Sequence, residues 1–187
     1  MGIGTLNGAM SFLGVESLQG GTGADQFVFG ASGSVTGRVL GGDGSDTISF
    51  AAKTTAQTVN LQLNTASSTG GFGGIESFVG GSSATLFDVL IGANSSTGWR
   101  IHGANTGTLF STPTGAVDFG GFESVTGGTA EDVFEISSGG SLSGVLTGGT
   151  ATGVIDRMDL SNKPTALDFR LDATSNKIPG VINGNYT

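Results

Sequence analysis

Aspartates follow glycine-rich turns at several points of this 187-residue chain. Asp25 closes the turn 20–24, and Asp43 and Asp46 lie in the turn 41–46. Carboxylate oxygens and backbone carbonyls are the ligands that Ca²⁺ prefers, about six to eight at a time. A turn made of small residues leaves its carbonyls free to face an ion. These aspartates are therefore the first candidates for binding chemistry.

A Glu-Ser pair followed two residues later by two glycines recurs three times, with Glu16, Glu76 and Glu123 as its acidic residue. A row of such carboxylates on one face of the protein would be able to bind cations or sugars. The alternative is that each glutamate bonds to its own turn or faces solvent at a bend. Because the pair recurs together with the repeat, the structural alternative accounts for it without a ligand.

Other candidates for chemistry are sparse. Trp99, Arg100 and His102, the single histidine, would form a surface patch for a sugar or a protein, or are drift within the repeat. A glycosidase would need two carboxylates that flank the scissile bond. Asp156 and Asp159 lie close in sequence, but the lysines and arginines are scattered and no nucleophile–base pair is present. The sequence therefore favours a protein that is not an enzyme.

Short alternating runs bounded by glycine clusters surround these turns, and such runs predict β-strands. Residues 26–29, 47–50 and 59–63 form one series of runs after the first Glu-Ser pair. Residues 133–136 and 167–171 repeat two of its members. No long segment keeps the 3.6-residue period of a helix. We therefore expect an all-β chain with almost no helix.

Three repeats of this series divide a single domain that covers the whole chain, 1–187, at about residues 15–74, 75–121 and 122–181. The third repeat retraces the first, and the second is shorter. The chain thus begins and ends inside a repeat. This indicates either a piece of a longer array or a subunit that stacks end to end, because open ends of such an array expose unpaired strands.

The second repeat departs from the pattern in two ways. Residues 98–101 align with residues 37–40, and most of the strand that should follow is missing. Thr85 stands where the turn motif has an aspartate. In the third repeat Asp132 is kept, and the next aspartate reappears at Asp156 after an insertion.

Glycine pairs set the length of one unit of the fold. Gly20 and Gly41 lie 21 residues apart, and so do Gly127 and Gly148. A unit of about 20 residues with only short strands must stack on its neighbours to bury its apolar face. We expect a parallel β-solenoid of roughly eight or nine such rungs, with an antiparallel sandwich as the alternative. The expected inward side chains are Phe27, Phe29, Ile48, Phe50, Leu61, Phe87, Phe134, Ile136 and Phe169.

Residues 41–49 fit the pattern G-G-x-G-x-D-x-U-x at every defined position, and residues 20–28 fit it too. The chain thereby resembles, over nearly its whole length, the RTX-like repeats of very large secreted bacterial proteins of the adhesin type. The resemblance implies a β-roll with calcium between stacked turns, at Asp25, Asp43 and Asp46 and, less completely, at Asp132. The alternative is that the aspartates bond to turn amides and hold no metal, because the matching turns are not in tandem.

Composition argues against several classes of function and of binding site. The net charge of −8 argues against nucleic acid, which is bound through Lys and Arg. The absence of cysteine excludes disulfides and thiolate metal sites. No apolar run approaches the roughly 18 residues of a membrane span.

The resemblance implies a bacterial extracellular or cell-surface protein, and we expect a non-catalytic structural or adhesive module of a stalk, fibre or matrix. Its partners would be adjacent repeats or like subunits end to end, together with surface or matrix glycans or proteins. Three alternatives remain. They are a module that folds only with calcium, a filament subunit that assembles by end-to-end stacking, and a β-helical polysaccharide-active enzyme.

Overall fold

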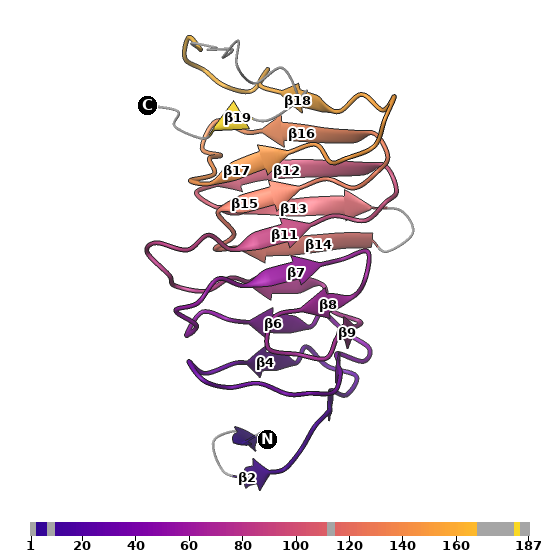
Figure 1. The fold of residues 1–187 in the computed structure, drawn as a ribbon, viewed down its shortest axis with the longest axis vertical. Helices are drawn as coiled ribbons and strands as arrows, with labels where there is room; N and C mark the ends of the chain where they lie inside the picture. The colour runs from indigo at the N-terminus through magenta and orange to yellow at the C-terminus, as the bar shows by residue number, and fades with distance from the viewer. Residues whose placement is uncertain (1–2, 7–9, 112–114, 168–181, 184–187) are drawn as a thin grey trace.

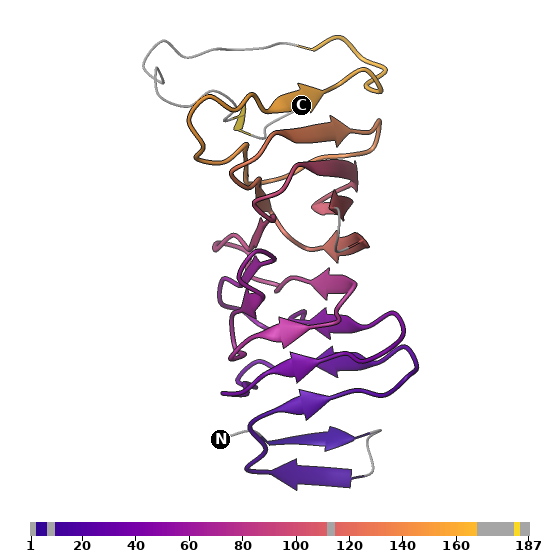
Figure 2. The ribbon, with the colours of Figure 1, turned by 90° about the vertical axis from the view of Figure 1, so that its right-hand side faces the viewer.

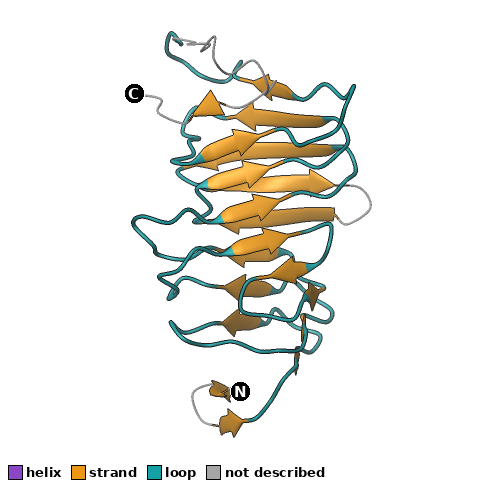
Figure 3. Cartoon of the chain, in the orientation of Figure 1, coloured by secondary structure: helices purple, strands orange, loops and turns teal. Residues whose placement is uncertain are grey.

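The structure, a computed structural model, describes residues 3–6, 10–111, 115–167 and 182–183. These residues form β-strands and turns and contain no helix (Figure 3), which confirms the all-β prediction. The strands are stacked along one long axis, with the N-terminal hairpin at one end and β18 toward the other (Figure 1). The hairpin consists of β1 (Ile3–Leu6) and β2 (Met10–Leu13), which form a two-stranded sheet of their own.

Three further sheets contain the remaining strands. The eight-stranded sheet has the order β18-β16-β12-β13-β14-β10-β6-β4. In chain order its strands are β4 (Gln26–Val28), β6 (Thr47–Ser49), β10 (Ser77–Val79), β12 (Thr97–Gly103), β13 (Thr106–Ser111), β14 (Gly115–Gly120), β16 (Asp132–Ile136) and β18 (Arg157–Asp159).

The two smaller sheets have six and three strands. The six-stranded sheet has the order β19-β17-β15-β11-β7-β8, and the three-stranded sheet has the order β3-β5-β9. The strands of the six-stranded sheet are β7 (Thr58–Asn60), β8 (Thr65–Ala66), β11 (Val89–Ile91), β15 (Ser124–Thr126), β17 (Val145–Thr147) and β19 (Ile182–Asn183). Those of the three-stranded sheet are β3 (Leu18–Gln19), β5 (Val39–Leu40) and β9 (Phe72–Gly73).

Consecutive strands mostly alternate between the eight-stranded sheet and a smaller sheet, as Figure 2 shows from the side. We call such a pair a layer, for example layer β3–β4 or layer β15–β16. Strands of neighbouring layers pair in parallel, with Leu18 opposite Val39 and Gln26 opposite Thr47. Val125 lies opposite Leu146 in the same way. The 21-residue spacing of the glycine pairs is therefore the spacing between paired strands.

The sheets are mixed, so the prediction of a wholly parallel ladder is wrong for part of the chain. Strands β12, β13 and β14 form an antiparallel meander within the eight-stranded sheet. Strands β8 and β19 also pair antiparallel, with β7 and β17. The meander has parallel neighbours on both sides, because β12 pairs with β16 and β14 pairs with β10. The second repeat has thus gained strands where the sequence indicated a deletion.

Residues 98–101 also lie in a different place from the one predicted. Strand β12 is in register with β16, so that Thr97 lies opposite Asp132 and Trp99 lies opposite Phe134. Trp99 therefore occupies the position of the core phenylalanine that follows a turn aspartate. The predicted alignment with residues 37–40 is wrong, because β12 belongs to the eight-stranded sheet and β5, which contains Val39 and Leu40, belongs to the three-stranded sheet.

The middle residue of most short strands is buried, as the two-residue period of a strand requires. Ile48, Phe78, Leu90 and Val125 are each fully buried in this way. Burying one such side chain contributes about 1.5–3 kcal/mol. One continuous apolar core therefore holds the layers together.

The predicted core is largely correct. Phe29, Ile48, Phe50, Phe134 and Ile136 are buried, and Phe27 and Leu61 are partly buried against them. Phe169 lies outside the described residues.

One core prediction is wrong, because Phe87 is 49% exposed. The turn before β11 ends three residues later than the sequence indicated, because the aspartate position falls at Asp88 and not at Thr85. Asp88 takes the buried position, and Phe87 is left at the surface of the turn.

Candidate functional site

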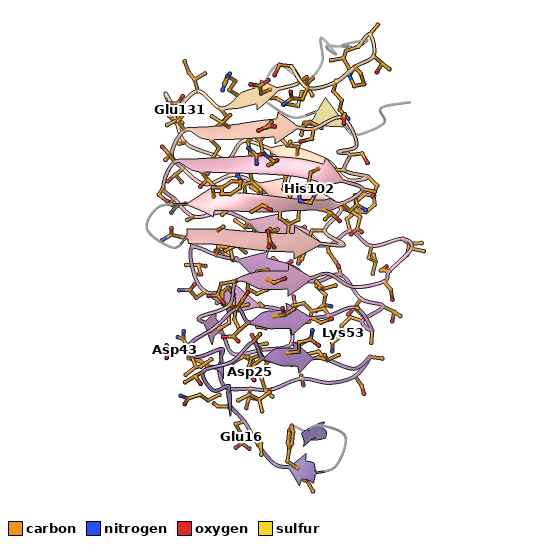
Figure 4. All side chains as sticks on the ribbon, turned by 180° about the vertical axis from the view of Figure 1, so that it is seen from behind. Glu16, Asp25, Asp43, Lys53, His102 and Glu131 are labelled. Carbon is orange, nitrogen blue, oxygen red and sulfur yellow. The ribbon has the colours of Figure 1, made fainter. Side chains whose placement is uncertain are left out.

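The aspartates of the first repeat stack directly on each other at the starts of β4 and β6. The N–H of Asp25 donates to Oδ1 of Asp46 at 2.8 Å, and Oδ2 of Asp25 accepts the N–H of Gly21 at 2.7 Å. Asp46 is fully buried and Asp25 is half-buried. The third predicted ligand, Asp43, is exposed, and its N–H donates to the carbonyl oxygen of Gly21 (Figure 4). Turn amides are therefore bonded to the carboxylates.

The third repeat has the same arrangement at β16 and β18. Oδ2 of Asp132 accepts the N–H of Gly128 at 2.8 Å. The N–H of Asp132 donates to Oδ1 of Asp156 at 2.9 Å. Asp156 therefore occupies the position of Asp46, which confirms that the aspartate reappears after the insertion.

The second repeat also has its aspartate, which the sequence analysis missed. Asp88, not Thr85, binds the turn: its Oδ2 accepts the N–H of Gly81, and its Oδ1 accepts the N–H of Gln57 at 2.6 Å. Gly81 lies seven residues before Asp88, whereas Gly21 lies four residues before Asp25. The signal in the sequence is the apolar run Val-Leu-Ile directly after Asp88, which marks the start of a strand.

Two of the three glutamates also accept the backbone N–H of an aspartate in a neighbouring layer. Oε2 of Glu76 accepts the N–H of Asp46 at 2.9 Å, and Oε2 of Glu123 accepts the N–H of Asp88 at 2.8 Å. Glu16 is exposed before β3 in the three-stranded sheet. The glutamates do not form a row on one face, because Glu76 precedes a strand of the eight-stranded sheet and Glu123 precedes one of the six-stranded sheet. Glu76 and Glu123 have the structural role.

The carboxylates do not gather around one point. Among the described residues, no three His, Asp or Glu side chains are grouped so that they would hold a metal ion. Within the described part of the chain, Oδ2 of Asp46 and Oδ1 of Asp132 are buried without a hydrogen-bond partner. Calcium at Asp25, Asp43 and Asp46, or at Asp132, remains a prediction. These two oxygens are the atoms on which it depends.

Burial changes the acidity of two of these aspartates. Burial, together with the charge of Asp156, raises the pKa of Asp132 from 3.8 to about 6. The hydrogen bond from the N–H of Gly128 acts in the opposite direction. Burial also raises the pKa of Asp88, against the amides of Gln57 and Gly81. Burial therefore favours the protonated, neutral form of Asp132 and Asp88 over the charged form.

The stability of the fold is expected to fall as the pH rises through about 6. A pKa raised in the folded state means that the folded protein binds the proton more tightly, so this stabilisation is present below about pH 4 and is lost above pH 6. The shift corresponds to no more than about 3 kcal/mol. Urea unfolding between about pH 4 and pH 7 measures the slope. The Asp132→Asn variant should show a flatter slope, and an unchanged slope would contradict the assignment to Asp132.

The predicted surface patch at Trp99, Arg100 and His102 does not exist as such. Trp99 is only 1% exposed and stacks on Phe134, with ring centroids 5.6 Å apart and an interplanar angle of 22°. Arg100 forms an ion pair with Glu135 at 3.2 Å. Arg100 and His102 are both exposed, and His102 is labelled in Figure 4. Trp99 is a core residue, because β12 presents it at an inward position.

Two lysines in equivalent positions bind backbone carbonyls. Nζ of Lys53 donates to the carbonyl oxygen of Gly33 at 2.5 Å, and Nζ of Lys163 donates to that of Gly140 at 2.6 Å. Burial lowers the pKa of Lys53. Both lysines thus hold a turn of the neighbouring layer.

The chain matches no protein-family model, no curated protein and no solved structure. The described part of the chain contains no helix with the length and apolar character needed to cross a membrane.

Proposed function

We propose that the chain is a non-catalytic structural module, a β-solenoid with two strands per turn that serves as a stiff element of a bacterial stalk, fibre or matrix outside the cell. Alternation between sheets and the parallel pairing of strands 21 residues apart support the solenoid. The antiparallel meander β12–β14 is then an insertion in one of its sheets. The RTX-like turn motifs support the extracellular location.

One observation carries this proposal: the acidic side chains are used to join layers. The N–H of Asp25 bonds to Asp46, and the N–H of Asp46 bonds in turn to Glu76. The N–H of Asp132 bonds to Asp156 in the same manner. Hydrogen bonds to charged groups contribute about 1.5–3 kcal/mol each. Bonds of this kind recur between several pairs of neighbouring layers and resist their separation, which is the property that a stalk or fibre needs.

The side chains that a catalytic site would need are engaged in structural hydrogen bonds. Asp156, a candidate catalytic residue, accepts the amide of Asp132. Lys53 and Lys163 bind carbonyl oxygens instead of facing a carboxylate. A polysaccharide-active enzyme would need an acid and a base that converge on one bond. The described residues offer no such pair.

Calcium-dependent folding is the second candidate, and a specific observation favours it. Oδ2 of Asp46 is buried without a donor in the turn that fits the nonapeptide completely. A cation at that oxygen would remove the cost of an unpaired buried acceptor. The amides that already bind Oδ1 of Asp46 and Oδ2 of Asp25 weigh against it, since they occupy two of the oxygens needed.

Single-molecule force spectroscopy on the full chain, pulled from both ends, tests both candidates in one experiment. If the chain is a structural solenoid, it should resist extension and then lengthen in discrete steps as layers detach. The steps should be the same in excess chelator and in calcium. Gradual lengthening without steps in both solutions would contradict the structural function. Steps that appear only with calcium would favour the second candidate.

A further inference from the structure

Layer β3–β4 has a close counterpart within the same molecule, which serves as an internal control. Layer β15–β16 has the same repeat positions, with Val125 where layer β3–β4 has Leu18, and Phe134 where it has Phe27. Val125 is fully buried and Phe134 is 1% exposed. Leu18 and Phe27 are only half-buried. The apolar side chains of layer β15–β16 are therefore covered, whereas the equivalent side chains of layer β3–β4 are partly exposed.

The difference comes from the neighbour on the N-terminal side. Strand β15 pairs with β11, and β16 pairs with β12, so layer β15–β16 has a strand below each of its own. Strands β3 and β4 are the end strands of their sheets. The β1–β2 hairpin lies beyond them (Figure 1) but pairs with neither. The N-terminal side of layer β3–β4 is thus an unpaired edge.

On this open side, the contacts of the described residues do not explain why position 21 is a glycine. At Gly128 a Cβ atom would overlap the carbonyl oxygen of Ala93, in the layer below. At Gly42 it would overlap the carbonyl oxygen of Gly21. Gly21 has the position of Gly128, yet its Cβ would meet only Oδ2 of Asp25 at 4.0 Å, and its φ is not in the left-handed region. Gly21 leaves room for a backbone that none of the described residues supplies.

The acceptors on this side are likewise unused. Oδ1 of Asp46 and Oδ1 of Asp156 each accept the N–H of the layer before them. Among the described residues, no donor bonds to Oδ1 of Asp25 or to the carboxylate of Glu16. Glu16 corresponds to Glu123, whose Oε2 accepts such an N–H. Glu16 and Asp25 thus each have a carboxylate oxygen on the open side that is able to accept a hydrogen bond from a backbone N–H.

We propose that the open side of layer β3–β4 binds a layer from a second copy of this chain. The proposed interface continues the one that already joins layers within the molecule: Gly21 admits the partner's backbone, and Glu16 and Asp25 accept its N–H groups. Because both carboxylates lie on this side, two copies would repel each other if they met through the same side. The association is therefore heterologous, head to tail, and extends beyond a dimer. This inference rests on the stacked layers of the proposed function.

Sedimentation velocity over a concentration series tests the inference with three versions of the full chain. We expect the wild type to form a series of oligomers. Gly21→Ala should weaken association about tenfold or more, which corresponds to about 1.4 kcal/mol, because the new Cβ blocks the partner's backbone. Gly23→Ala is the matched control. Its Cβ would also point into open space, and the covered layer has Ala130 at that position, so association should remain as in the wild type.

Glu16→Ala provides a second variant in case Gly21→Ala disturbs folding, because Glu16 is exposed. It should also weaken association while the melting temperature stays unchanged. A wild type that sediments as a monomer at every concentration would overturn the inference, and so would equal association of Gly21→Ala and Gly23→Ala. A monomer that still unravels in steps under force would leave the proposed structural function intact.

Discussion

Replacing Trp99 with alanine is expected to lower the free energy of unfolding by about 3 to 5 kcal/mol. Trp99 is 1% exposed and is packed between Phe134, at 5.6 Å between ring centroids, and Phe119, at 6.0 Å. The truncation would leave a cavity where the meander joins the parallel part of the eight-stranded sheet. Urea denaturation followed by circular dichroism measures the loss.

His102 supplies the matched control, because it lies on the same strand but is exposed. His102→Ala should change the free energy of unfolding by no more than about 0.5 kcal/mol. If Trp99 were instead a surface binding residue, its replacement would cost about as little as that of His102. Similar stabilities for the two variants would therefore contradict the core position of Trp99.

Asp88→Ala is expected to cost about 3 to 5 kcal/mol as well, because it leaves two amides without an acceptor. The N–H groups of Gly81 and Gln57 both bind the Asp88 carboxylate, and a buried polar group without a partner costs about 1–3 kcal/mol. The N–H of Asp88 itself binds Glu123, and alanine would keep this bond. Thermal unfolding followed by calorimetry gives the difference directly.

Thr85 is the residue that the turn motif places where the aspartate should be, and it is exposed. Thr85→Ala should therefore leave stability within about 0.5 kcal/mol of the wild type. The two variants together decide which residue holds the turn of the second repeat. A larger loss from Thr85→Ala than from Asp88→Ala would show that the longer turn is wrongly placed.

The parts of the fold that depend on local sequence could be predicted. The spacing from Gly20 to Gly41 gives the parallel pairing of Gln26 with Thr47, because both strands follow the same turn at the same distance. The absence of helix and most of the core follow from alternation and glycine content. The role of Asp132 as an acceptor for a turn amide was one of the two alternatives that the sequence left open.

The rest depends on which strands meet, and no local pattern contains that information. Asp88 was missed because a longer turn shifts the aspartate without changing the residues around it. The meander was missed because its strands alternate like any others. Asn105, with a φ of 52°, marks the turn between β12 and β13, and a left-handed asparagine is typical of such turns. One asparagine is a weaker signal than the alignment of the whole second repeat with the first, so the sequence alone does not predict this turn.

The Glu-Ser pairs lie alternately in front of a smaller sheet, the eight-stranded sheet and a smaller sheet again. In the proposed solenoid, a group attached at this repeat position would therefore project over the eight-stranded sheet in the second repeat and over a smaller sheet in the first and third repeats. The same Glu-Ser motif would then present groups on two flanks of the module, and two partners bound to them would be held apart by the thickness of the fold.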